Sequence, residues 1–216
     1  MKKLVILASL ASAVMFAATA GTTPKATATT EVAAPAKART FKVDVAKSDL
    51  KWHAKKVTGE HMGTIGLKSG QMLIDGNKVT GGTFVIDMNS IACTDIKDAE
   101  YNQKLVGHLK SDDFFSVEKH GTATFKITGV KPIAKAAAGQ PNHTVTGDLT
   151  IKGITNQVSF PATITVKNGV ASAKGDVTIN RAKYDVRYGS NSFFDNLGDK
   201  AIYDDFVVTL DVTAKQ

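Results

Sequence analysis

The chain has 216 residues, of which 43% are hydrophobic and 22% charged, with 18 glycines and 5 prolines. This composition is typical of a globular protein and excludes a collagen-like, a disordered or a multi-span membrane chain. The single cysteine, Cys93, excludes an intrachain disulfide and the common zinc sites built from several cysteines. About 170 residues remain beyond the N-terminal segments, enough for one domain that buries roughly 70% of its unfolded surface.

The first forty residues are distinct from the rest of the chain. In residues 1–20, two lysines precede an apolar run, Leu4 to Ala18, that ends in a triplet of small residues, the pattern of a cleavable secretory signal. The run is shorter than the ~20 apolar residues of a spanning helix, so we expect no membrane span after cleavage. Residues 21–40 hold almost only Thr, Ala, Pro and Lys, and are predicted to form a flexible tether. We therefore expect a soluble protein that is exported, for example to the periplasm.

The charge balance gives little support for a nucleic-acid partner. The net charge is +7, and loss of the two signal lysines leaves 25 basic against 20 acidic residues, or +5. The remaining lysines are scattered along the chain. The nearest approach to a basic stripe, Lys51 to Lys56, does not place its lysines on one face of a strand. We interpret these lysines as protection for a sheet edge and expect no nucleic-acid binding.

From Phe41 onward, apolar and polar residues alternate with the period of two that is typical of β-strands with one buried face. The clearest run is 158–166. Similar runs include Leu50 to Ala54, Phe84 to Met88, Ala123 to Ile127, Val145 to Ile151, Ala171 to Ile179 and Ile202 to Val212. We predict turns at Asp75-Gly76-Asn77, Gly81-Gly82, Gly153 and Asn168-Gly169. Short one-sided strands joined by hairpins predict an all-β, antiparallel fold.

One interruption of this pattern is helical. Apolar residues recur at four-residue spacing from Tyr101 to Leu109, and Asp95 and Asp98 are candidate N-caps, so we predict a helix of about three turns. A lone helix between strands is suited to cover one end of a barrel, and closing the sheet removes its exposed edges. We therefore expect an extended antiparallel barrel of about eight strands, with one helix covering an end.

The connection from Asn180 to Lys200 is unusually long for a compact domain and carries several large apolar side chains. Because such groups are costly to leave in water, we expect this connection to pack across the barrel mouth. The connection from Lys131 to Asn142 has few large apolar side chains, so we interpret it as an exposed loop.

The sequence offers little catalytic chemistry. It has no nucleophile elbow and no glycine-rich phosphate loop, and Cys93 has no evident activating partner. Asp112 and Asp113 are interpreted as a turn leading into a strand rather than as paired acids. The histidines show no metal-binding spacing; they are His53, His61, His108, His120 and His143. We predict no catalytic residue, no metal site and no cofactor.

What remains is the barrel interior. Eight strands enclose a space that can be filled by side chains or can hold one small ligand, and the sequence leaves both cases open. The ligand-binding positions predicted from the alternation are Trp52, Phe84, Ile86, Phe125, Ile127, Leu149, Phe160, Ile164, Val177, Phe206 and Val208. The predicted polar contacts near a mouth are His61, Arg181, Tyr184 and Tyr188. The alternative for these four is that they only tie loops to the barrel.

Two segments resemble signatures of a known family. Residues 113–119 (DFFSVEK) and 147–155 (GDLTIKGIT) are similar to motifs of the YceI-like family, the polyisoprenoid-binding proteins of the bacterial periplasm. The resemblance covers nearly all of Phe41 to Thr213, and we assign residues 41–216 to one such domain. It implies a lipocalin-like barrel with a helix at one end, whose cavity holds an isoprenoid chain such as that of a prenylated quinone. It implies no catalytic residue.

The leading hypothesis is therefore an exported binding protein that encloses an isoprenoid lipid for carriage or storage. Two alternatives stay open: an enzyme acting on a prenylated lipid at the barrel mouth, and a filled barrel that binds another protein. The sequence does not distinguish a monomer from a dimer.

Overall fold

The computed structural model describes residues 38–216. The predicted signal, residues 1–20, and residues 21–37 of the predicted tether lie outside the described residues. The strands are β1 (Arg39–Val43), β2 (Asp49–Lys56), β3 (Gly59–Asp75), β4 (Lys78–Cys93), β5 (Thr122–Pro132), β6 (His143–Ile151), β7 (Ile154–Lys167), β8 (Val170–Asn180) and β9 (Ile202–Lys215). The helices are α1 (Ala99–Lys110) and the short 3-10 helices η1 (Val45–Lys47), η2 (Arg181–Tyr184) and η3 (Gly198–Lys200).

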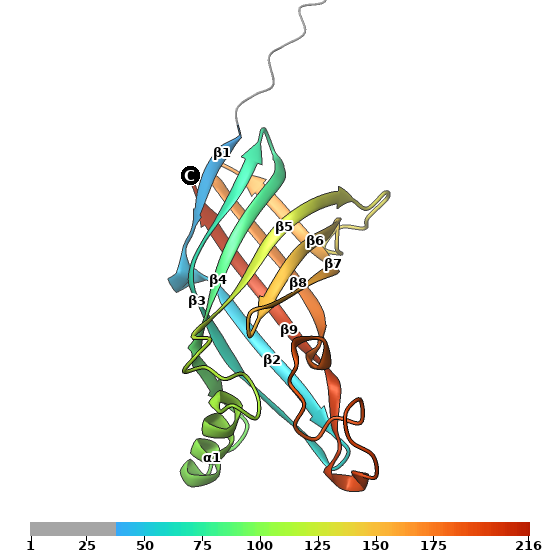
Figure 1. Cartoon of the computed structure of the whole chain (residues 1–216). Helices are drawn as coiled ribbons and strands as arrows, with labels where there is room; N and C mark the ends of the chain where they lie inside the picture. The colour runs from blue at the N-terminus through green and yellow to red at the C-terminus, as the bar shows by residue number, and fades with distance from the viewer. Residues whose placement is uncertain (1–37) are drawn as a thin grey trace, which may run out of the picture. The chain divides into compact units, whose positions relative to one another are not determined.

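All described strands belong to one antiparallel sheet that closes on itself through the pairing of β3 with β4 (Figure 1). Strands β1 and β2 share one position in the ring, between β3 and β9. Strand β2 pairs with the first part of β3, from Gly59 to Thr64, and β1 with its last part, from Gln71 to Ile74. The nine strands therefore fill eight positions around the ring, which confirms the predicted closed antiparallel barrel of about eight strands.

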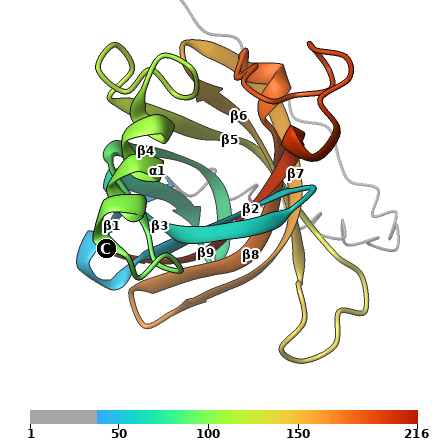
Figure 2. The same cartoon turned by 90° about the horizontal axis from the view of Figure 1, so that it is seen from below.

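The two ends of the barrel differ. The sealed end, near β1 and the C-terminus, is packed with fully buried residues; Phe41, Ile74, Ala162, Ala171 and Ala214 are each 0% exposed. Tight hairpins close it at residues 75–78 and 167–170. The open end, at the bottom of Figure 1, carries the two long connections, residues 94–121 with α1 and residues 181–201. Seen from below, α1 and the 181–201 connection lie on different sides of the opening (Figure 2).

The predicted helix is confirmed, with Asp98 as its N-cap. The Asp98 Oδ1 accepts hydrogen bonds from the backbone N–H groups of Glu100 and Tyr101, each at 3.0 Å. This satisfies two of the four amide groups that a helix start leaves unpaired. Tyr101 is 65% exposed, whereas Leu109 packs against the core. The helix therefore attaches to the barrel mainly through its last turn, beside β4.

The predicted turn at Gly81-Gly82 is wrong, because both residues lie inside β4 and pair with Leu73 and Met72 of β3. A Cβ at Gly82 would lie 2.8 Å from the Gln71 carbonyl oxygen, so the glycine permits a close approach of two strands rather than a turn. Positive φ angles do occur at Gly76, Gly153 and Gly169, where the turns were predicted correctly.

Candidate ligand cavity

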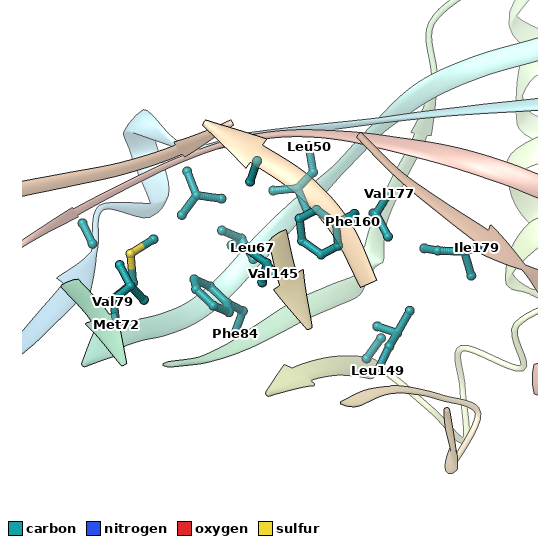
Figure 3. Packing of buried hydrophobic residues seen from close by; sticks show 14 of the residues in the cluster. Leu50, Leu67, Met72, Val79, Phe84, Val145, Leu149, Phe160, Val177 and Ile179 are labelled. Atoms are coloured by element: carbon teal, nitrogen blue, oxygen red, sulfur yellow. The ribbon is translucent and has the colours of Figure 1, made fainter. Parts of the chain in front are cut away.

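The barrel encloses a cavity of about 220 Å³. Its wall takes residues from every strand from β2 to β9, and Figure 3 shows part of this packing. All of the predicted ligand-binding positions line the cavity, namely Trp52, Phe84, Ile86, Phe125, Ile127, Leu149, Phe160, Ile164, Val177, Phe206 and Val208. Their alternation with outward-facing residues was therefore assigned correctly. That they contact a ligand stays a prediction.

The cavity wall is apolar apart from Arg181 and Tyr203. The indole N–H of Trp52 donates hydrogen bonds within the protein, to the carbonyl oxygens of Thr64 and Ala92 at 3.2 and 3.1 Å. Gly63 makes room for this ring, since a Cβ there would lie 2.5 Å from it. The wall therefore offers van der Waals contact along its length rather than hydrogen bonds.

A row of phenylalanines crosses the cavity. The ring of Phe125 lies 6.3 Å from that of Phe84 and 5.9 Å from that of Phe160, measured between centroids. The absence of a side chain at Gly147 on β6 leaves room for Phe125, because a Cβ on Gly147 would lie 2.4 Å from the Phe125 ring. Small residues such as Gly147 and Ala173 therefore set how much of the interior stays free of side chains.

The cavity is long for its volume. On β9 its lining runs from Ile202 to Val212. That distance is roughly 33 Å along a strand at ~3.3 Å per residue, or roughly 25 Å along the barrel axis for a strand tilt of ~40°. Its shape fits an extended chain better than a compact molecule.

Arg181 lies at the open end and lines the cavity, but it is only 4% exposed. Its guanidinium donates hydrogen bonds to the carbonyl oxygens of Val186, Tyr188, Ile202 and Tyr203, at 2.8 to 3.2 Å. Asp204 Oδ1, which accepts no hydrogen bond, forms an ion pair with Arg181 Nη2 at 3.3 Å. Burial lowers the pKa of Arg181, and the nearby Asp204 opposes this shift. The guanidinium therefore ties the 181–201 connection to β9.

Tyr188 does not line the cavity, but it joins the two long connections at the open end. Its ring lies 4.5 Å from that of His108 and 5.4 Å from that of Phe114, between centroids. The Phe114 ring lines the cavity and also lies under the Arg181 guanidinium, at 5.9 Å. Tyr188 is 47% exposed, so this contact is a partly solvated bridge.

The other two predicted mouth residues also lie outside the cavity wall. Tyr184 is 1% exposed, its hydroxyl has no hydrogen-bond partner, and burial raises its pKa to about 12. His61 Nδ1 lies 2.8 Å from Asp95 Oδ2. Asp95 Oδ1 accepts hydrogen bonds from the Met62 N–H at 2.9 Å and from the Cys93 thiol at 3.2 Å. Asp95 therefore links β3 to the end of β4.

Two neighbouring titratable groups at the open end, Cys93 and Asp95, have shifted pKa values. Burial raises the pKa of the Cys93 thiol, which keeps it protonated and a weak nucleophile. Burial acts to raise the pKa of Asp95 as well, but the hydrogen bonds that this carboxylate accepts have the larger effect and lower its pKa to about 2. Among residues 38–216, no group of three or more His, Cys, Asp or Glu side chains is arranged to hold a metal ion.

The sequence reasoning missed the part of the wall that comes from the connections. Leu109, Phe114, Phe115, Ile202 and Tyr203 all line the cavity at the open end. Leu109, Phe114 and Phe115 lie outside the runs of period-two alternation from which the site was predicted, whereas Ile202 and Tyr203 begin the run from Ile202 to Val212. The large apolar residues of the 180–200 connection were the available signal. They predicted that this connection covers the mouth, without indicating which side chains face the cavity.

The fold and the cavity define a closed antiparallel barrel with an apolar interior. A sequence profile of the YceI-like domain matches residues 41–214. The chain belongs to the YceI-like family, as its motifs had predicted. In the part of the chain that the structure describes, no helix is long and apolar enough to cross a membrane.

Curated relatives match over short segments. A UPF0312 protein of Ectopseudomonas mendocina is 46% identical over 55 residues, which is 26% of this chain and 26% of that protein. A UPF0312 protein of Staphylococcus aureus is 35% identical over 91 residues, which is 38% of this chain and 46% of that protein. The matched segments thus span from about a quarter to under half of these relatives.

Solved structures match over most of the domain. BcnA of Burkholderia cenocepacia has a TM-score of 0.59 and 25% sequence identity, covering 80% of this chain and 99% of that one. A polyisoprenoid binding domain from Saccharophagus degradans, implicated in plant cell wall breakdown, has a TM-score of 0.55 and 17% identity, covering 81% and 97%. These likenesses place the barrel among YceI-like folds.

Proposed function

We propose that this protein encloses the apolar chain of an isoprenoid lipid, such as a prenylated quinone, and carries or stores it outside the cytoplasm. The observation that carries the proposal is the cavity, which is apolar from the sealed end to the open end. Membership of the YceI-like family supports it, as does the shared fold with a domain described as polyisoprenoid binding. Binding is non-covalent.

The length of the cavity favours a chain that is bound in an extended form. One leaflet of a bilayer holds chains in a hydrocarbon layer of ~15 Å, half of the ~30 Å core. The cavity lining spans roughly 25 Å along the barrel axis, by the strand rise and tilt. A chain that reaches from the open end to the sealed end is therefore more extended than the disordered chains of a leaflet.

Burial alone supplies enough free energy for binding. An apolar chain with ~20 buried carbons gains roughly 16 kcal/mol of gross transfer free energy, at ~0.8 kcal/mol per methylene. Association and ordering costs on the order of 10 kcal/mol leave roughly 6 kcal/mol, which corresponds to a Kd on the order of tens of micromolar. Hydrogen bonds to the chain are not required.

The geometry of the open end favours binding over catalysis. The guanidinium of Arg181 is occupied by carbonyl groups of the protein. The resolved pKa shifts of Asp95, to about 2, and of Tyr184, to about 12, move both groups away from neutrality. A general acid or base acting at neutral pH needs the opposite shift.

Organic extraction and mass spectrometry of the mature chain, residues 21–216, purified from its own periplasm, test the proposal. We expect one class of prenyl lipid at close to one molecule per protein. An empty protein that also takes up no prenylated quinone in vitro would overturn the proposal and direct attention to protein partners.

A cavity-filling variant tests where the chain lies. Ala173 lines the cavity, and the side chain of Ala173→Phe would occupy the space that we assign to the lipid. We expect lipid retention to fall at least tenfold, while the melting temperature Tm stays within a few degrees of the wild type. The matched control is Ser172→Phe, the next residue on β8, which does not line the cavity. A folded Ala173→Phe protein with full lipid content would show that the chain lies elsewhere.

A further inference from the structure

The barrel wall has a seam between β7 and β8. Pairing of these strands runs from the hairpin at 167–170 to Ala162 and Gly175, and ends there. Beyond that point, residues 154–161 of β7 pair with β6, and residues 176–180 of β8 pair with β9. We call the facing stretches 154–161 and 176–180 the seam.

The sequence explains where the pairing ends. Pro161 has no backbone N–H to donate to β8. A Cβ on Gly175 would lie 2.6 Å from the Pro161 carbonyl oxygen, so the strands still touch at this point. The seam opens from there toward the open end of the barrel. Because no ladder hydrogen bond crosses it, a group can pass between its walls without breaking strand pairing.

A polar groove lies along the seam, and it is distinct from the barrel cavity. It is lined by Asn156, Gln157, Val158, Ser159, Thr178, Asn180, Lys183, Tyr184 and Asp205. Val158 lines both the groove and the barrel cavity. At this residue the wall between the two spaces is a single side chain thick.

Tyr184 lines the groove and packs against the hydrophobic core. It is 1% exposed, and its hydroxyl has no hydrogen-bond partner. Because burial keeps this hydroxyl protonated, it is a donor without an acceptor. A buried polar group of this kind is destabilising, so an oxygen atom of a ligand would relieve the cost of burying it.

The groove has a balanced charge and fixed walls. Lys183 and Asp205 contribute one charge of each sign. The Asn156 side-chain amide donates to the Lys183 carbonyl at 3.0 Å, which fastens η2 to β7. The Asn180 amide donates to Asp205 Oδ1 at 2.8 Å, which joins β8 to β9. A site without net charge suits a neutral ligand group better than a diphosphate.

We propose that this groove holds the head group of the lipid whose chain occupies the barrel, and that the head group reaches it through the seam. The head group is neutral and presents a hydroxyl or carbonyl oxygen to the Tyr184 hydroxyl. The inference rests on the proposed function, because it requires a lipid chain in the cavity. It differs from the simpler arrangement in which the head group stays at the open end.

Tyr184→Phe tests the site because it removes only the hydroxyl. The probes are geranylgeraniol and the hydrocarbon of the same skeleton without the hydroxyl, each displacing a fluorescent polyene from the full mature chain. We expect Tyr184→Phe to weaken geranylgeraniol binding about five- to tenfold, and the hydrocarbon less than about twofold. Its Tm should be unchanged or higher by about 2–4 °C, since an unpartnered hydroxyl is removed.

Tyr101→Phe is the matched control, because Tyr101 lies on the exposed face of α1, is 65% exposed and lines neither the cavity nor the groove. We expect both probes to bind it as they bind the wild type. A loss of geranylgeraniol affinity in Tyr101→Phe, or none in Tyr184→Phe, would overturn the groove assignment. Tighter binding of geranylgeranyl diphosphate than of geranylgeraniol would overturn the neutral head group. A wild type that binds neither chain would instead refute the proposed function.

Discussion

The two ends of the barrel are held together by different forces. At the sealed end, apolar residues such as Phe41 and Ile74 are fully buried. At the open end, Arg181 and Asp95 hold the connections through hydrogen bonds to backbone groups. Apolar burial resists opening over the whole buried surface, whereas a few hydrogen bonds can be lost locally. The barrel therefore has one end built for stability and one that can admit a chain.

The largest difference between the ends should appear in core truncations. Phe41→Ala removes a side chain that is 0% exposed, and we expect it to lower the free energy of unfolding by about 3–5 kcal/mol. Phe206 lies near the open end and is only partly buried. We therefore expect Phe206→Ala to lower the free energy of unfolding by less than about 2 kcal/mol. Urea unfolding followed by fluorescence of Trp52, the only tryptophan, measures both. Equal losses would remove the distinction between the ends.

Acid should loosen the open end through Asp95, whose pKa is lowered to about 2 by its hydrogen bonds. A folded pKa below the unfolded value of ~3.9 means that Asp95 stabilises the fold above pH ~4 and loses this contribution as pH falls toward ~2. We expect the free energy of unfolding of the wild type to exceed that of Asp95→Asn by about 1–2 kcal/mol at pH 6 and by almost nothing at pH 2. A difference that stays constant over this range in urea unfolding would contradict the assignment.

The smallest effect on stability is expected at the aromatic bridge. Tyr188→Ala removes the contacts with His108 and Phe114, and because Tyr188 is 47% exposed the cost should be below about 1 kcal/mol. Exchange of a bound fluorescent polyene should nevertheless become several-fold faster, since the two long connections are no longer joined. Tyr101→Ala on the exposed face of α1 is the control. Unchanged exchange in Tyr188→Ala would show that this bridge does not limit entry.

The strands of the barrel were predictable because period-two alternation reports which face of a strand is buried. It placed Phe125 and Phe160 on the cavity wall without any knowledge of pairing. The open end was not predictable in the same way. His61, Tyr184 and Tyr188 were expected at a mouth, yet none lines the cavity. Tyr184 and Tyr188 lie in a long connection, whose side chains have no fixed period, and His61 lies in β3 beside Asp95. The seam was also missed, since it depends on where two strands stop pairing.

The shared ring position of β1 and β2 has a consequence for the ends of the folded domain. Strand β1 begins at Arg39 on the sealed end, and the last residue lies beside it, since Arg39 Nη1 donates a hydrogen bond to Gln216 Oε1 at 2.9 Å. Both attachment points therefore lie on the side remote from the opening. A fluorescent protein or surface anchor fused after Gln216 would leave the entrance unobstructed, which makes this barrel a convenient handle for immobilised lipid capture.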